Sequence, residues 1–147
     1  MKGHKHIGAY GVIIENNKIL LIKKKGGPYD GKLDLPGGTI EYKERPEESL
    51  IREMKEEVGI DVTNFELLDV DSVNVIWHHN NENELVHHIA VFYKIISYDK
   101  DILNEVEITD INDDSMGAEF YDIESLKIND VSNITSLILN KLGYKIK

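Results

Sequence analysis

The chain contains no cysteine. This excludes a disulfide framework, a thiolate nucleophile and any zinc site built on cysteine. No apolar stretch approaches the length of a membrane span, and the first residues, Met1 to His6, lack the apolar core that a signal peptide needs. We therefore expect a cytoplasmic protein.

Basic residues are scarce, with 17 Lys and Arg against 27 Asp and Glu, which gives a net charge of −10. Such a balance argues against duplex nucleic acid or an anionic membrane as a partner, because both require basic patches. The chain has 147 residues, of which 41% are apolar and 30% charged, and no linker or repeat is visible. These values predict one folded domain over residues 1–147.

Negative charge is concentrated in one predicted helix, Pro46 to Val58. Proline suits a first helical position, and Gly59 is a natural stop. Glu53, Glu56 and Glu57 share a helix face because they are three and four positions apart. An acidic run is more often a solvated surface, but a hard cation with oxygen ligands would turn this repulsion into affinity. The cluster therefore indicates a site for Mg²⁺ or Mn²⁺.

The same helix has an apolar arc beside its acidic one. Leu50, Ile51, Met54 and Val58 fall within this arc, and we expect them to pack against a sheet. Arg45 stands where a serine or aspartate would be a better cap, so the sequence predicts a weak helix start.

An ordered set of residues surrounds the acidic cluster. Its members are Gly38, Glu44, Arg52, Glu53, Met54, Glu56, Glu57, Gly59 and Ile60. At each of these positions the chain resembles the signature of the Nudix (MutT-like) hydrolases, and the preceding Leu35-Pro36-Gly37 resembles the usual lead-in. One departure is Leu33, where many members carry a tryptophan. The close resemblance covers residues 31–60, and a weaker strand pattern extends it to most of the chain.

The resemblance implies a Nudix-type α/β/α sandwich with a mixed central sheet and two main helices. It implies a metal-dependent hydrolase in which water attacks a phosphorus of a nucleoside diphosphate derivative, such as a nucleoside triphosphate or a nucleotide sugar. The expected partner is a small nucleotide substrate, and a homodimer is common in such families. The alternative is a Nudix-fold nucleotide-binding or regulatory module without catalysis, against which the intact glutamates argue.

The resemblance also implies roles for individual residues. Glu53, Glu56 and Glu57 would bind the metal, with the carbonyl oxygen of Gly38 completing the set. Arg52 is expected to orient a carboxylate rather than to touch substrate. Glu44 is expected either to bind an outer ion or to hold the loop.

The general base is left open between two groups of residues. Glu53 is the first candidate. The others belong to the acidic segment near the C-terminal third, whose carboxylates are otherwise read as solvated: Glu105, Glu107, Asp113, Asp114 and Glu119.

The rest of the chain reads as strands and a second helix. The expected strands are His6–Ile14, Lys18–Lys24, Leu33–Leu35, Thr39–Glu41, Phe65–Trp77, Leu85–Ile96 and Ala118–Ile123, with a hairpin turn at Glu15-Asn16-Asn17. Asp130 is expected to cap the last helix, and Gly143 to end it. The apolar stripe of that helix would contain Val131, Ile134, Leu137 and Ile138.

Two further sets of residues have open roles. The lysines beside the glycine-rich loop, Lys23, Lys24, Lys25 and Lys32, either meet a phosphate or offset the acidic surface, and Lys25 and Lys32 are the candidates for substrate binding. Trp77 and Tyr10 either stack on a nucleobase or lie in the core.

Four histidines lie beside the expected central hairpin: His78, His79, His87 and His88. No more than two of them share a sheet face, so surface or half-buried positions are expected rather than a zinc site.

Overall fold

The computed structural model describes residues 1–102 and 115–147. Four of the predicted alternatives for the general base lie outside these ranges: Glu105, Glu107, Asp113 and Asp114. Glu119 lies within them, as an exposed residue of a strand.

The strands and helices follow one another in the order β1 (Lys2–Val12), β2 (Ile14–Glu15), β3 (Lys18–Lys24), β4 (Leu33–Asp34), β5 (Gly37–Thr39), α1 (Pro46–Val58), β6 (Asp61–His79), β7 (Glu82–Asp99), β8 (Ser115–Asp122) and α2 (Asn133–Lys141). Two short 3₁₀ turns, Ile123–Ser125 and Ile128–Asp130, lie between β8 and α2. The expected strands are present except at Thr39–Glu41, where the strand is Gly37–Thr39 and shares only Thr39 with the prediction. β6 and β7 are longer than predicted.

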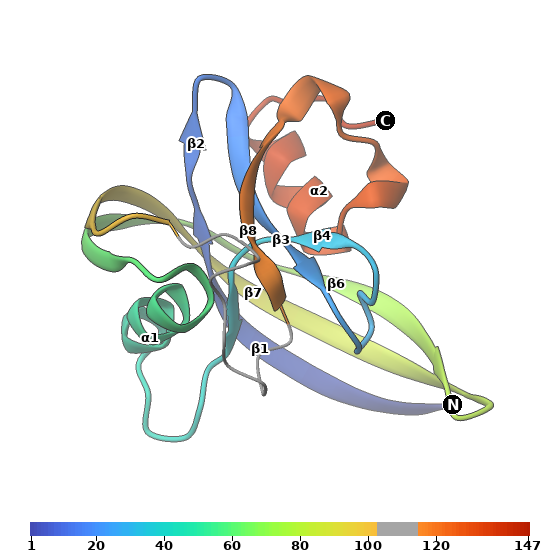
Figure 1. The fold of residues 1–147 in the computed structure, drawn as a ribbon. Helices are drawn as coiled ribbons and strands as arrows, with labels where there is room; N and C mark the ends of the chain where they lie inside the picture. Colours follow the sequence, from blue (N-terminus) through green and yellow to red (C-terminus); the bar gives the residue numbers. More distant parts are fainter. Residues whose placement is uncertain (103–114) are drawn as a thin grey trace.

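The strands form two sheets rather than one (Figure 1). The first has the order β5-β1-β7-β6 and is mixed, since β1 runs parallel to β7 while the other pairs are antiparallel. In the second, β3 pairs antiparallel with β2, β4 and β8. The two main helices and the mixed sheet agree with the predicted fold class.

Two asparagine pairs close the hairpins of the fold. Asn16 and Asn17, between β2 and β3, have φ of 52° and 62°, and Asn80 and Asn81, between β6 and β7, have φ of 50° and 60°. Asparagine tolerates this left-handed conformation better than most residues do. Two such residues in succession match the twist of a hairpin, and the first of the two turns lies where the sequence predicted it.

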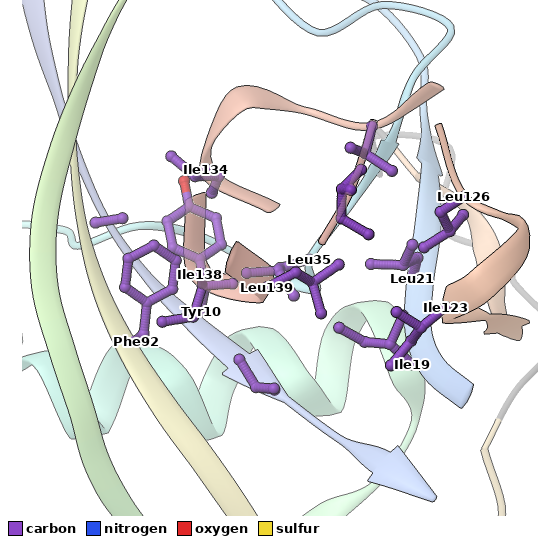
Figure 2. Packing of buried hydrophobic residues seen from close by; sticks show 14 residues of the cluster. Tyr10, Ile19, Leu21, Leu35, Phe92, Ile123, Leu126, Ile134, Ile138 and Leu139 are labelled. Atoms are coloured by element: carbon purple, nitrogen blue, oxygen red, sulfur yellow. The ribbon is translucent and has the colours of Figure 1, made fainter. Parts of the chain in front are cut away.

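β3 is buried on both faces because it lies between the two helices. Ile19 and Leu21 belong to the apolar cluster on the α2 side, drawn in Figure 2. Leu20 and Ile22 point the other way, into the cluster beneath α1. All four are fully buried. Successive strand residues face opposite sides, so this short apolar run suits the middle layer of a sandwich.

α1 packs against the strands through a narrower stripe than predicted. Leu50, Met54 and Val58, each four positions apart, are fully buried, whereas Ile51 is 41% exposed. Ile51 lies about 100° around the helix from Leu50, and this rotation turns it off the sheet. The helix start is stabilised by its own glutamate, since the N–H of Arg45 donates to Glu48 Oε1 at 2.8 Å.

α2 begins at Ser132 and not at the predicted cap, Asp130, which ends a 3₁₀ turn. The Ser132 hydroxyl accepts a hydrogen bond from the Thr135 N–H and itself donates to the buried Asp34 at 2.6 Å, so this residue fixes the helix to β4. Val131 is buried but precedes the helix. Gly143 has φ of 98° and follows the last helical residue closely, as expected.

The two α-helices have 13 and 9 residues. In the described parts of the chain, no helix is both long and apolar enough to cross a membrane.

Candidate active site

A cavity of about 430 Å³ is lined by residues of α1, of β1, β5 and β7, and of the loop between β3 and β4. We call its α1 side the acidic wall, formed by Arg52, Glu53, Glu56 and Glu57. We call the opposing set of rings the aromatic wall, formed by His6 and Tyr10 of β1, Tyr29 of the loop and His88 of β7. All four predicted residues of α1 therefore line one cavity.

The three glutamates of the acidic wall differ in their exposure to solvent. Glu57 is buried, the Glu53 side chain is 13% exposed, and that of Glu56 is 52% exposed. Burial, followed by the charge of Glu53, raises the pKa of Glu56. The wall therefore holds negative charges that repel each other in a partly desolvated place.

Arg52 is surrounded by the oxygen atoms that it was predicted to orient. Its Nε and Nη2 donate to the two oxygens of Glu44 at 2.7 and 3.0 Å. Its Nη1 donates to Glu53 at 2.9 Å and to Glu56 at 3.2 Å, and Nη2 also donates to the Thr39 carbonyl at 3.2 Å. These bonds, with that to Glu44 first, raise the pKa of Arg52. The contacts support a positioning role for the guanidinium.

Glu44 holds the loop that precedes α1. Its Oε1 accepts from the Glu41 N–H at 2.9 Å while the same carboxylate binds Arg52. The hydrogen bonds from Arg52 also lower the pKa of Glu44. Of the two roles predicted for this residue, the structure favours that of holding the loop.

Two glycines allow β5 to approach both β1 and α1. A Cβ at Gly38 would lie 2.8 Å from Glu53 Oε1, so the Glu53 carboxylate lies directly against this backbone. Gly37 has φ of 143°, and a Cβ there would lie 2.2 Å from the Ala9 carbonyl oxygen. Any side chain at either position would displace the backbone or the glutamate.

The acidic wall has the donor chemistry for a divalent cation. Three carboxylates from one helix, with the Gly38 backbone against Glu53, provide the kind of oxygen ligands that Mg²⁺ and Mn²⁺ prefer. Across residues 1–102 and 115–147, no three acidic or histidine side chains are gathered closely enough to hold a metal as they stand. Glu53 and Glu56 instead share Arg52 Nη1, each through one of its two carboxylate oxygens, so a cation would be bound through the other oxygen of each while Arg52 holds the pair in place.

The aromatic wall is centred on His88, which sequence reasoning did not place in the site. Its ring is completely buried and stacks on His6, with centroids 4.4 Å apart. Its Nε2 lies 2.6 Å from the Tyr10 hydroxyl, and its Nδ1 lies 2.7 Å from the Tyr29 hydroxyl. Burial, with the nearby charges of His6 and Lys24, lowers the pKa of His88 to about 3. The ring is therefore neutral at ordinary pH.

Asp34 also lines the cavity, and it too was read from sequence only as a strand residue. Its Oδ1 accepts from the Ser132 hydroxyl at 2.6 Å, the Leu35 N–H at 2.8 Å and the Thr135 hydroxyl at 3.4 Å. Burial raises the pKa of Asp34, although Lys24 and these hydrogen bonds act against that rise. A carboxylate between two leucines was the signal that could have identified it.

The other candidates are divided between the cavity and the surface. Lys24 lines the cavity, whereas Lys25 is exposed and neither it nor Lys32 is among the described residues that line it. Tyr10 is buried and borders the cavity, but Trp77 stacks on His79 far along β6, with centroids 3.6 Å apart.

The four histidines beside the central hairpin were expected at surface or half-buried positions. This expectation is wrong for His88, which is completely buried. It is correct for His78, which is exposed and contacts Asn83, and for His79, which is half-buried and contacts Glu84 at 3.2 Å. His87 is half-buried. In the described ranges no histidine belongs to a group suited to a metal.

The order of residues 38–60 and the layered fold both point to one family, and the sequence model of the NUDIX domain matches residues 4–139. The chain belongs to the NUDIX domain family. Residues 38–60 are therefore called the NUDIX motif below.

Named relatives agree with this assignment. The chain is 32% identical over 124 residues to an ADP-ribose pyrophosphatase of Methanocaldococcus jannaschii, covering 84% of this chain and 65% of that protein. It is 44% identical over 66 residues to an 8-oxo-dGTP diphosphatase of Proteus vulgaris, covering 44% of this chain and 58% of that protein. The chain thus spans less than two thirds of the length of these curated relatives.

A solved structure confirms the fold class. The MutT NUDIX hydrolase from Burkholderia pseudomallei superimposes with a TM-score of 0.74 at 26% identity, over 95% of this chain and 98% of that one.

Proposed function

We propose that the protein is a metal-dependent pyrophosphohydrolase, a single NUDIX domain over residues 1–147 that cleaves the diphosphate linkage of nucleoside diphosphate derivatives. The observation that supports it best is that Arg52, Glu53, Glu56 and Glu57 line one cavity together with Lys24. The named activities of the two relatives, on ADP-ribose and on 8-oxo-dGTP, point to the same class of substrate.

In this proposal Glu53, Glu56, Glu57 and the Gly38 carbonyl hold Mg²⁺ or Mn²⁺. A divalent cation neutralises phosphate oxygens and makes a bound water more acidic. It also explains how a chain with a net charge of −10 accepts an anionic substrate. The buried position of Glu57 makes it the best candidate for the innermost ligand, since a desolvated carboxylate gains most from a cation.

In the proposed reaction Arg52, Glu53 and Lys24 have different roles. Arg52 fixes the Glu53 and Glu56 carboxylates by its hydrogen bonds. Glu53 accepts the proton of the attacking water, whose oxygen forms a bond to phosphorus as one P–O bond of the diphosphate linkage breaks. Lys24, at the cavity wall, offsets the charge of the phosphates.

The experiment that tests this proposal is a substrate panel with three arms. ADP-ribose, 8-oxo-dGTP, a nucleotide sugar and ordinary nucleoside triphosphates are incubated with the protein in Mg²⁺, in Mn²⁺ and in chelator, and the released phosphate, pyrophosphate or nucleotide is measured. We expect at least one compound to be hydrolysed in Mg²⁺ or Mn²⁺ and not in chelator. Tight binding without turnover in either metal would instead support a regulatory module.

A thermal scan gives a second readout that needs no substrate. A cation that binds only the folded protein stabilises it by about 2.7 kcal/mol at a concentration a hundredfold above its Kd. The melting temperature should therefore rise in Mg²⁺ or Mn²⁺ relative to chelator. No shift in either ion would contradict the assignment of the three glutamates as ligands.

A further inference from the structure

The aromatic wall contains a buried histidine that the proposed hydrolysis does not use. His88 lies on β7, and tyrosines from two other segments contact both of its ring nitrogens: Tyr10 of β1 at Nε2 and Tyr29 of the β3–β4 loop at Nδ1. All three side chains line the same cavity as the NUDIX motif. Such a network limits where its protons can lie.

A neutral imidazole has one N–H donor and one acceptor nitrogen. Because His88 is neutral, with a pKa lowered to about 3 by burial, it donates to one tyrosine and accepts from the other. The tyrosine that accepts from His88 retains its own hydroxyl proton for a third group.

Tyr10 is the tyrosine that has to donate to His88. Both tyrosines are buried, with 2% of Tyr10 and 5% of Tyr29 exposed, so exposure does not separate them. The Tyr10 hydroxyl, however, is enclosed so closely that a Cβ at Gly8 would lie 2.5 Å from its oxygen. A buried donor in such a place uses the acceptor already in contact with it, which is His88 Nε2. His88 Nδ1 then carries the ring proton and donates it to the Tyr29 oxygen at 2.7 Å.

The Tyr29 proton is therefore available to the cavity. In the described parts of the chain, the contact with His88 is the only hydrogen bond that the Tyr29 side chain makes. Its hydroxyl stays protonated, because burial and then the charge of Asp34 raise the pKa of Tyr29. The Tyr29 hydroxyl can therefore donate a hydrogen bond to an acceptor group of a molecule that enters the cavity.

We propose that Tyr29 is a specificity-determining residue whose hydroxyl donates a hydrogen bond to an uncharged acceptor on the group attached to the diphosphate. A carbonyl oxygen or an unprotonated ring nitrogen has this chemistry. His88 and Tyr10 are positioning residues that act through Tyr29, and His6 supports His88 by stacking on it. This inference rests on the proposed function, because it assigns a second part of the same cavity.

Kinetics of Tyr29→Phe test the proposal, with Tyr42→Phe as the matched control because Tyr42 is fully exposed. The probes are whichever of ADP-ribose and 8-oxo-dGTP the wild type hydrolyses. Loss of one neutral hydrogen bond should raise KM about three- to tenfold, with little change in kcat and none in the control. An unchanged KM in Tyr29→Phe would overturn the proposal.

The preference between substrates provides a readout that a purely structural role would not move. The ratio of kcat/KM for two hydrolysed compounds that differ in their acceptor groups should change in Tyr29→Phe and stay the same in Tyr42→Phe. Equal losses on both compounds would contradict a role in specificity.

Nitrogen-15 NMR of the histidine rings tests the proton arrangement without any substrate. His88 should be neutral near pH 7 with its proton on Nδ1, and a proton on Nε2 would overturn the assignment of Tyr29 as the free donor. The two proposals fail separately. A wild type that hydrolyses nothing refutes the proposed function, whereas an active wild type whose KM is insensitive to Tyr29→Phe refutes only this inference.

Discussion

The two walls of the cavity are built in opposite ways. The acidic wall comes from one short stretch of α1, where the helical repeat alone places Glu53, Glu56 and Glu57 on neighbouring arcs. In the aromatic wall, His88 is 78 positions away from Tyr10 and 59 from Tyr29 along the chain. The first wall is charged and partly solvated, whereas the second is uncharged and, apart from the half-buried His6, buried. In the two proposals above, the residues for the chemistry therefore come from one local segment, whereas those for recognition are brought together by the whole fold.

The largest expected effect concerns the acidic wall. Glu57→Gln and Glu56→Gln should each lower kcat by about a hundredfold or more, because each removes a negative charge that the metal needs while keeping the shape of the side chain. The measurement is kcat in saturating Mg²⁺, with Glu66→Gln on the exposed part of β6 as the control. Wild-type turnover in either variant would remove that residue from the ligand set.

Arg52→Lys should lower kcat by about tenfold and leave KM nearly unchanged. The lysine keeps the positive charge but cannot form the paired bonds to Glu44 together with those to Glu53 and Glu56. Steady-state kinetics on a hydrolysed substrate separate the two parameters. An effect confined to KM would make Arg52 a substrate contact and would weaken the contrast between the walls.

His88 of the aromatic wall should make the free energy of unfolding depend on pH. The pKa of His88 is about 3 in the folded state and near 6.5 when unfolded. Between these values the unfolded chain binds a proton that the folded chain does not, so stability is complete above pH 6.5 and falls as the pH drops through this window. The slope from one such group is at most about 1.4 kcal/mol per pH unit.

Urea unfolding at several pH values between 4 and 7 measures that slope. It should be shallower in His88→Gln than in the wild type, and unchanged in His78→Gln, which alters an exposed ring. His6, whose pKa is also lowered by burial, adds a slope of the same sign. Equal slopes in the wild type and in His88→Gln would show that the ring does not titrate as a buried neutral group.

The smallest effects are expected for the lysines. Lys24→Ala should raise KM more than Lys25→Ala or Lys32→Ala, because only the first of these side chains lines the cavity in the described structure. For Lys25 and Lys32 we expect increases of no more than about fivefold that shrink at high salt, as for exposed charges. KM values at two salt concentrations decide this. A larger effect at Lys25 would mean that substrate extends over the glycine-rich loop.

Local sequence patterns were sufficient to predict the bounds of α1 but not the cap of α2. The bounds of α1 are those predicted, because a proline at its first position and a glycine after its last one are strong local signals. The cap of α2 was misplaced, since the choice between Asp130 and Ser132 depends on a hydrogen bond to Asp34 in another part of the chain. Ile51 was predicted to pack against the sheet but is 41% exposed, because its hydrophobicity alone does not show how far the sheet extends beneath the helix.

The aromatic wall could not be predicted from spacing. Tyr10 and His88 meet because β1 lies parallel to β7, and this pairing places His6 beside His88. Nothing in the order of the residues fixes that register, which depends on contacts between segments far apart in the chain. The partners of Asp34 in Ser132 and Thr135 are likewise about 100 positions away, so the residues beside it, partly buried Leu33 and buried Leu35, indicated only a strand.

The pairing of β5 with β1 has a consequence for how this chain can change over evolutionary time. Ala9 opposes Gly38 and Tyr10 opposes Gly37, so a one-residue insertion at the glycines would turn the side chains that follow in β5 to the opposite face. The loop that carries Tyr29 is different, because Gly26, Gly27 and Gly31 have open space around them. Insertions and deletions there can reshape the recognition side of the cavity without moving the glutamates. On the proposed role of Tyr29, changes in the length of this single loop would be a route to altered substrate preference.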